Sequence, residues 1–245
     1  MTVIILQIEM KSKIKILPET VINRIAAGEV IERPASVVKE LMENSIDAGS
    51  RNIEVRFKNG GKELIYVIDD GTGMSEEDAI LCFERHSTSK VFKFEDLEKI
   101  NTFGFRGEAL SSIASVSIVE LKTKIKEEKE GTYIRISGGK QEEIKKIPWN
   151  IGTSVSVKNI FFNVPGRRKF LKSNLSESRH IYSIFKKISL ANTYITFLLF
   201  NDDKIVWKLR EDSLENRLVE LYNEEILTNS LKIDNEFNDL KLYGY

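Results

Sequence analysis

The chain has 245 residues, in which 37 Lys and Arg balance 37 Asp and Glu. The length allows one large domain plus part of another, and the zero net charge does not mark the whole surface as a nucleic-acid binder. A single cysteine, Cys82, excludes an internal disulfide and predicts a protein of the reducing cytoplasm. The absence of a transmembrane run in the sequence predicts no membrane partner.

The first segment, MTVIILQIEM, carries a short apolar patch. The patch is too short, and too poor in positive charge before it, for a signal peptide. We therefore treat residues 1–12 as an N-terminal extension, and the start of translation stays open between Met1 and Met10.

A helix is predicted at residues 34–49 (PASVVKELMENSIDAG). Pro34 suits the first turn, where a missing N–H costs nothing, and Gly49 suits the left-handed position after the last turn. The apolar residues recur at helical spacing and cover most of one side: Val38, Leu41, Met42 and Ile46. The pattern is that of an amphipathic helix.

The other side of this helix carries Glu40, Asn44 and Asp47, which fall within a wedge of roughly 60° at 3.6 residues per turn. A carboxylate beside a carboxamide can hold a water and a hard cation that prefers oxygen ligands. The alternative is an ordinary solvated face, which this helix by itself does not exclude.

A buried strand is predicted at residues 62–69, and it runs directly into Asp69-Asp70-Gly71-Thr72-Gly73. Glycines two apart after a strand permit positive φ and close backbone approach. A carboxylate at the strand end can accept a hydrogen bond from an amino group such as that of adenine. The alternative is a plain acidic turn. The spacing matches neither a dinucleotide fingerprint nor a Walker loop.

Two motifs flank a polar stretch further along: RHSTSK at 85–90 and FGFRGEAL at 103–110. The stretch between them has little periodicity and is long enough to indicate a functional lid. We expect a helix to begin at Gly107, where backbone N–H groups form an anion site. The alternative, a flexible surface loop with a glycine cap, explains Gly104 and Gly107 but not the ordered S-T-S-K. Before these motifs, Ser75 caps a helix that carries Cys82 as a small hydrophobe.

The second half of the chain reads as further strands and helices. Antiparallel strands are predicted at 116–124, 131–137, 141–147 and 153–159, with a Gly-Gly turn at 138–139 and a solvated charge run at 122–129. A helix at 179–192, a strand at 194–200, a helix at 211–222 and a hairpin at 231–245 follow.

The basic cluster GRRKFLK at 166–172 is the most cationic part of the sequence. Arg167, Arg168 and Lys169 could neutralise DNA phosphates in a salt-dependent, sequence-blind contact. The alternative is that they cap and solvate the helix that follows. His86 and His180 show no metal-ligand spacing, so no zinc site is predicted.

Taken in order, ExxxN on a helix, DxGxG after a strand, GFRGEAL and a later Gly152-Thr153 resemble the Bergerat (GHKL) ATP-binding fold of gyrase ATPase subunits, heat-shock chaperone ATPases, histidine kinases and MutL proteins. Four longer stretches resemble the MutL mismatch-repair ATPases specifically: IAAGEVIERPASVVKEL at 25–41, RHSTSK at 85–90, GFRGEAL at 104–110 and FNVPGRRKFL at 162–171. The resemblance covers residues 13–245.

The resemblance implies roles for single residues. Glu40 is expected to be the general base for the attacking water, and Asn44 the ligand of Mg²⁺. Asp69 is expected to accept from the adenine amino group, Gly73 to let the base approach, and Thr153 to support Asp69. Asp47 has three open roles, near the sugar, near the magnesium waters, or as an orienting neighbour. The expected phosphate lid comprises Thr88, Ser89, Lys90, Gly104, Phe105, Arg106, Gly107, Glu108, Ala109 and Leu110.

The implied fold is α+β: a two-layer α/β sandwich of the Bergerat type, with a mixed, largely antiparallel sheet and helices on one face. Residues 13–210 are expected to form the ATP-binding domain, and residues 211–245 to begin a truncated second domain of ribosomal-protein-S5-like fold. In the family that second domain supplies a lysine to the γ-phosphate. No counterpart exists in these residues, so we expect a fragment whose hydrolysis is weak.

The resemblance implies a mismatch-repair ATPase that hydrolyses ATP with Mg²⁺ to ADP and phosphate. Lid ordering on ATP binding would drive homodimerisation and couple mismatch recognition, by a protein of the MutS type, to repair on non-specifically bound DNA. Two alternatives stay open: a nucleotide-gated interaction module with negligible turnover, and a topoisomerase-type ATPase, which GEVIERP and FNVPGRRKFL disfavour. The sequence leaves open an endonuclease activity, the rate of turnover and the oligomeric state without nucleotide.

Overall fold

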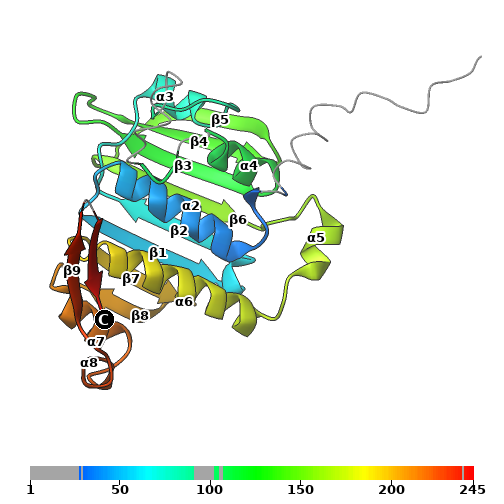
Figure 1. Cartoon of the computed structure of the whole chain (residues 1–245). Coiled ribbons are helices and arrows are strands. Elements are labelled where there is room, and N and C mark those ends of the chain that lie inside the picture. The colour runs from blue at the N-terminus through cyan, green and yellow to red at the C-terminus, as the bar shows by residue number, and fades with distance from the viewer. Residues whose placement is uncertain (1–27, 29, 91–101, 105–106, 239) are drawn as a thin grey trace, which may run out of the picture.

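The structure is a computed structural model of the chain. It describes residues 28, 30–90, 102–104, 107–238 and 240–245. Its body is a mixed eight-stranded sheet in the order β5-β4-β3-β6-β2-β1-β7-β8, with helices on one face (Figure 1). Neighbouring strands are antiparallel except β1 and β7, which are parallel. The predicted fold class, a two-layer α+β arrangement with a largely antiparallel sheet, is confirmed.

The strands of the sheet are β1 (Asn52–Lys58), β2 (Leu64–Asp69), β3 (Ile118–Lys124), β4 (Gly131–Ser137), β5 (Lys140–Ile147), β6 (Gly152–Lys158), β7 (Thr196–Asn201) and β8 (Lys204–Leu209). The helices are α2 (Pro34–Asp47), α3 (Glu76–Leu81), α4 (Ala109–Ser115), α5 (Pro165–Phe170), α6 (Asn174–Ala191), α7 (Leu214–Leu221) and α8 (Glu225–Thr228), with a short 3₁₀ turn η1 (Asn59–Gly61). A separate hairpin consists of β9 (Ile233–Phe237) and β10 (Leu240–Gly244).

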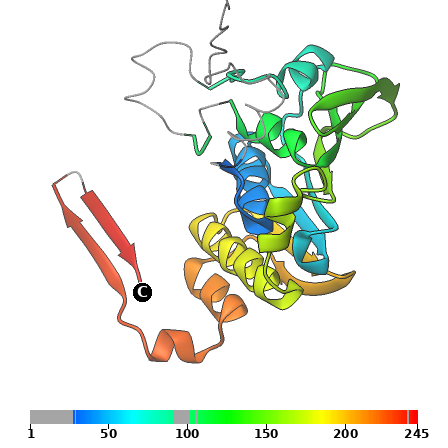
Figure 2. The same ribbon diagram turned by 90° about the vertical axis from the view of Figure 1, so that its right-hand side faces the viewer.

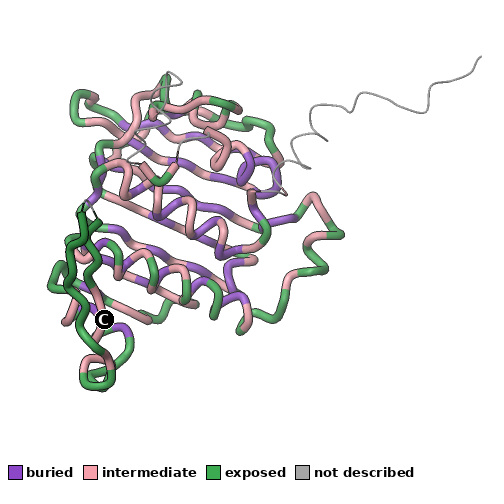
Figure 3. The backbone as a smooth tube through the Cα atoms, viewed as in Figure 1, coloured by how far each residue is buried: buried purple, intermediate pink, exposed green. Residues whose placement is uncertain are grey.

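Alternation along the strands builds the core. Ile53, Val55 and Phe57 of β1 are buried, while the residues between them are only partly covered. Since successive side chains of a strand point to opposite faces, one face of the sheet is apolar and packs under the helices. Figure 3 marks the buried residues along the strands of the sheet and along the helices.

Helix α2 crosses this apolar face and contributes Val37, Val38, Leu41 and Met42 to the core. It begins at Pro34 and is followed by Gly49 at φ +74°, as predicted. Helix α6 lies beside it on the same face (Figure 2). Because the core fixes one side of α2, its other side faces the loop residues at 85–90 and 102–104.

Several boundaries differ from the sequence prediction. The helix expected from Gly107 begins at Ala109, since Gly107 has φ +62° and lies outside it. Helix α6 begins at Asn174 rather than 179, because the side chain of Ser173 caps it by accepting from the N–H of Ser176 at 3.2 Å. Strands β1 and β8 were not predicted at all.

Helix α7 is tied to the sheet by Arg217, whose side chain is fully buried. Its guanidinium donates to four carbonyl oxygens. They belong to Ser189 near the end of α6, to Thr193 and Ile195 just before β7, and to Arg210 just after β8. A buried guanidinium needs such acceptors because an unsatisfied donor costs free energy. The predicted domain boundary at residue 210 stays a prediction.

The hairpin of β9 and β10 stands away from the sheet (Figure 2) and confirms the predicted hairpin at 231–245. Glu215 of α7 accepts from Lys232 at 3.0 Å and from the Tyr245 hydroxyl at 2.7 Å, which links the hairpin to α7. Within the ranges that the structure describes, no helix is long and apolar enough to span a bilayer.

Candidate functional site

The polar side of α2 faces two loops that are distant in the sequence. Asp47 accepts hydrogen bonds from Lys90 Nζ at 2.5 Å, from the N–H of Phe103 at 3.1 Å and from the N–H of Gly104 at 3.1 Å. Lys90 Nζ also lies 3.3 Å from Asn44 Oδ1. The structure therefore brings together four of the predicted site residues: Asn44, Asp47, Lys90 and Gly104.

The carboxylate of Asp69 lies at the end of β2, beneath the same helix. Ser45 Oγ donates to its Oδ2 at 2.8 Å, while the N–H groups of Gly71 and Thr153 donate to its Oδ1 at 3.0 and 3.3 Å. The predicted neighbours Asp69 and Thr153 are thus in contact. Asn44 and Ser45 are adjacent on α2, so one helix positions both the Asp69 end and the Lys90 end of the site.

Burial raises the pKa of the Asp69 carboxyl above its ordinary value, and the hydrogen bonds from Ser45, Gly71 and Thr153 oppose this rise. The carboxylate is therefore held in a partly dry environment, with fixed donors on one side. Such an acceptor is suited to an exocyclic amino group, because each hydrogen bond to a buried charge is strong.

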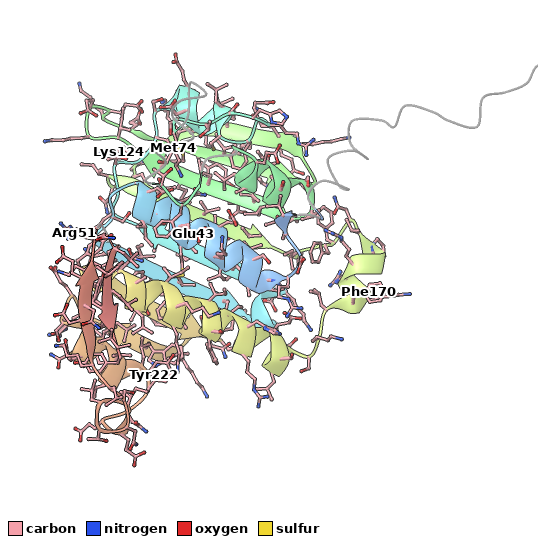
Figure 4. The ribbon with its side chains drawn as sticks, in the orientation of Figure 1. Glu43, Arg51, Met74, Lys124, Phe170 and Tyr222 are labelled. Atoms are coloured by element: carbon pink, nitrogen blue, oxygen red, sulfur yellow. The ribbon has the colours of Figure 1, made fainter. Side chains whose placement is uncertain are left out.

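The loop after β2 is held by its own residues. Asp70 accepts from the N–H groups of Arg51 and Asn52, both at 2.8 Å, which fixes the turn after α2. Gly73 has φ +72°, and a Cβ there would lie 2.0 Å from the carbonyl oxygen of Lys124. Figure 4 labels Met74 and Lys124, which lie near one another at this edge. Glycine is required at 73 by this contact, and its predicted role toward adenine stays a prediction.

The motif RHSTSK packs against the described residues of GFRGEAL. A Cβ at Gly107 would lie 2.4 Å from the carbonyl oxygen of Ser87, so the two backbones meet there. His86 Nδ1 lies 3.2 Å from Glu108 Oε1, and Thr88 Oγ1 accepts from the N–H of Lys90 at 3.2 Å. These contacts hold the two motifs together beside the cluster in which Lys90 and Gly104 contact Asp47.

Some predicted residues make no such contact. Phe105 and Arg106, with residues 91–101 of the predicted lid, lie outside the described residues. Ser89 is exposed, and Ala109 and Leu110 begin α4, where Leu110 packs on the core. Helix α4 has seven residues, and the predicted anion site at its N-terminus stays a prediction.

The predicted base, Glu40, lies one turn before Asn44 on α2 and has a partly exposed side chain. Its Oε1 accepts from Lys39 Nζ at 3.2 Å, and the same ammonium donates to Glu43 at 2.8 Å. Figure 4 shows Glu43 on the helix face away from the sheet. Glu40 thus shares the ammonium of Lys39 with Glu43, and its role toward a water stays a prediction.

The donor set at this face fits magnesium carried by a nucleotide. Mg²⁺ keeps several waters and usually takes one or two protein ligands together with phosphate oxygens. Asn44 offers a part-buried carboxamide oxygen, with the carboxylates of Glu40 and Asp47 on the same side of the helix. Among the residues described, no group of three His, Cys, Asp or Glu could hold a metal by itself.

The basic cluster lies on α5, apart from this site (Figure 1). Arg167 is committed to the fold: its guanidinium lies over the Phe161 ring at 5.4 Å and donates to the carbonyl oxygen of Ile31 at 3.3 Å. Arg168 and Lys169 are exposed. Phe170, labelled in Figure 4, is also largely exposed, with 83% of its surface accessible.

The sequence analysis missed three positioning contacts. Ser45 holds Asp69, Asp70 holds the turn at Arg51 and Asn52, and the buried Thr123 accepts from the N–H of Met74 at 2.9 Å. No local signal marks these residues, because each partner lies at least 18 positions away.

A family model described as "Histidine kinase-, DNA gyrase B-, and HSP90-like ATPase" matches residues 31–159 of the chain. Among curated relatives, the DNA mismatch repair protein MutL of Parabacteroides distasonis is 48% identical over 236 residues, which is 96% of this chain and 38% of that protein. The MutL protein of Chloroherpeton thalassium is 48% identical over 234 residues, or 96% of this chain and 37% of that protein. The chain thus spans well under half the length of these relatives.

Solved structures agree. The Aquifex aeolicus MutL ATPase domain complexed with ADP is 37% identical, with a TM-score of 0.65 over 79% of this chain and 70% of that chain. The N-terminal domain of a DNA repair protein is 26% identical, with a TM-score of 0.72 over 87% of this chain and 64% of that chain. The fold and the sequence therefore point to the same group of ATPases.

Proposed function

The chain belongs to the histidine kinase-, DNA gyrase B- and HSP90-like ATPase family and, within it, to the MutL proteins of DNA mismatch repair; from this premise we propose that it binds ATP with Mg²⁺ and hydrolyses it to ADP and phosphate. The observation that carries the proposal is the position of α2. Its buried Ser45 contacts the acceptor Asp69, and its polar side carries Asn44 into a cluster with Lys90.

Each end of the site has a separate task in this proposal. Asp69 accepts from the adenine amino group, and its partners Ser45 and Thr153 hold the carboxylate in the orientation that this requires. Lys90 and the backbone of Gly104 bind phosphate oxygens. Asn44 would hold Mg²⁺, which offsets phosphate charge when it is bound.

Hydrolysis requires a water in line with the γ-phosphate. Glu40 is the residue that we assign to orient this water and accept its proton, since it lies one helical turn from Asn44 on the same face. Positioning and charge stabilisation supply most of the catalysis in phosphoryl transfer.

The test is turnover of Mg-ATP by the purified chain beside a Glu40→Ala variant. We expect slow hydrolysis by the wild type and a loss of about 10²- to 10⁴-fold in the variant, with ATP binding nearly unchanged. Glu43→Gln, on the same helix, is the matched control and should retain activity. Equal rates for wild type and Glu40→Ala would contradict the assignment. Binding without measurable turnover in both would favour the nucleotide-gated interaction module.

The wider role is a proposal at the level of the whole protein. We propose that ATP binding promotes a homodimer and couples a mismatch-recognition partner of the MutS type to repair on DNA. Arg168 and Lys169 are the exposed cations that we assign to non-specific DNA contact. The ordering of the lid with nucleotide and the cytoplasmic location stay predictions.

A further inference from the structure

Asp47 is the most heavily bonded acidic side chain in the cluster. Its side chain is 5% exposed and accepts from one ammonium, Lys90, and from two backbone N–H groups, Phe103 and Gly104. These partners lie 43, 56 and 57 positions away in the sequence. Asp47 therefore holds the described residues of two loops against α2.

An ammonium and two backbone amides that converge on one anion form the same kind of donor set that binds a phosphate group. Lys90 and Gly104 are the residues to which the proposed function assigns phosphate binding. In this structure their donors are used by the Asp47 carboxylate. The carboxylate thus takes the place of a phosphate as their acceptor.

Asn44 adds a second constraint. Its Oδ1 lies 3.3 Å from Lys90 Nζ, so the ammonium faces the oxygen that is assigned to Mg²⁺. A divalent cation and an ammonium on the same oxygen repel one another. Lys90 must therefore leave Asn44 when the metal and the nucleotide bind.

We propose that Asp47 is a positioning residue that holds Lys90 and the backbone at 103–104 when nucleotide is absent, and that a phosphate group takes these donors from it on binding. The inference rests on the proposed function, because it assumes that the same donors bind ATP. The carboxylate of Asp47 then competes with the phosphates for the same donors, Lys90 and the N–H groups at 103–104. It also repels the phosphates directly through its charge.

The sign of the effect is testable with Asp47→Asn. An amide still accepts hydrogen bonds but lacks the charge that makes the contact with Lys90 strong. We expect the variant to bind ATP in EDTA about tenfold more tightly, since a hydrogen bond to a charged group changes an equilibrium by roughly that factor. Adenosine, which has no phosphates, should bind wild type and variant equally.

Calorimetric titrations of wild type, Asp47→Asn and Glu43→Gln with ATP in EDTA separate the outcomes. Glu43→Gln removes the same charge from the same helix without touching Lys90, so it should leave affinity within about twofold. Equal or weaker ATP binding by Asp47→Asn would overturn the inference and leave the proposed function intact. A wild-type chain that does not bind ATP would instead remove the proposed function.

A second measurement needs no variant at position 47. Hydrogen exchange of the nucleotide-free wild type should show protected amides at Phe103 and Gly104, because both donate to Asp47. Protection should persist when ATP replaces the carboxylate as acceptor. Unprotected exchange at both amides without nucleotide would contradict the inference even if Asp47→Asn fails to fold.

Discussion

Ser45 Oγ donates to Asp69 Oδ2 at 2.8 Å and joins helix α2 to the end of β2. The serine side chain is buried and also donates to the carbonyl oxygen of Leu41, one turn back on its own helix. The acceptor assigned to adenine is therefore held by the residue that directly follows the proposed Mg²⁺ ligand, Asn44. A change at Ser45 should alter the orientation of Asp69 without removing any group that touches the phosphates.

We expect Ser45→Ala to weaken ATP binding by about tenfold, because the carboxylate loses a buried donor and its pKa rises further. Hydrolysis at saturating ATP should fall much less, since Glu40 and Lys90 are unchanged. ATP titration and turnover measure the two effects. Ser189→Ala is the matched control: that buried helix serine donates to the carbonyl oxygen of Lys186 and has no link to the site. A loss confined to turnover would contradict this role.

Asp69→Asn should remove discrimination between nucleotides. The amide weakens the acceptor for the adenine amino group, whereas GTP presents no amino group at the equivalent position, so ATP affinity should fall more than GTP affinity. Titration of both nucleotides measures the ratio. Asp70→Asn is the neighbouring control, because Asp70 holds the main chain at Arg51 and Asn52 and should affect thermal stability rather than the ratio. Equal losses for ATP and GTP at Asp69 would argue against the adenine contact.

The raised pKa of Asp69 sets a pH dependence. As the pH falls, ATP binding should begin to weaken at a higher pH than it would if Asp69 had the ordinary aspartate pKa of about 3.9. The reason is that a carboxyl with a raised pKa becomes protonated at a higher pH. The stability effect has the opposite sense. A raised folded-state pKa favours folding below the unfolded value, and this contribution is lost as pH rises through the folded value. Thermal unfolding should therefore show Asp69→Asn gaining stability relative to wild type as pH rises, and parallel curves would contradict it.

The sequence was sufficient where the signal is local. Helix α2 follows from Pro34, from Gly49 and from apolar residues at helical spacing, and all of these act within one segment. Strand β1, which the sequence analysis does not predict, has an equally local signal, since Ile53, Val55 and Phe57 alternate with partly exposed residues. Strand β8 is less regular: its register shifts in the middle, opposite Leu199 and Phe200 of its partner strand, so strict alternation fails there.

The contacts of the site join residues that are far apart in the sequence, so they have no local signal. The bond between Asp47 and Lys90 joins residues 43 positions apart, one on a helix and one in an irregular loop. Periodicity carries no information about such a pair, because it depends on how the loop packs in three dimensions. The resemblance to MutL ATPases identified the participants, and only the fold shows that Asp47 accepts from the groups assigned to phosphate.

Asn44→Ala should reduce the effect of Mg²⁺ on ATP binding. Removal of one oxygen ligand weakens the hold on a hard cation, while binding of ATP in EDTA should change little. Titrations with and without Mg²⁺, in wild type and variant, give the difference. Asn174→Ala is a suitable control, since Asn174 lies at the start of α6 and donates to Asn59. An unchanged Mg²⁺ effect in Asn44→Ala would remove the metal role from this residue.

Helix α5 permits a test of DNA binding that separates charge from folding. Arg168 and Lys169 are exposed, so the double change Arg168→Ala with Lys169→Ala should weaken binding to duplex DNA of any sequence. The slope of log affinity against log salt is negative, and each lost phosphate contact makes it shallower by about 0.9. The slope of the double variant should therefore be shallower by about 1.8. Thermal stability should be nearly unchanged.

Arg167→Ala should give the opposite result. Its guanidinium lies over Phe161 and donates to Ile31, so its loss should lower the melting temperature by several degrees and leave the salt slope nearly intact. Lys204→Ala with Lys208→Ala, on the distant strand β8, controls for the loss of two charges. Affinity measured by fluorescence anisotropy across a salt series decides between the roles. Equal salt slopes for wild type and the Arg168/Lys169 double variant would show that these cations only solvate α5.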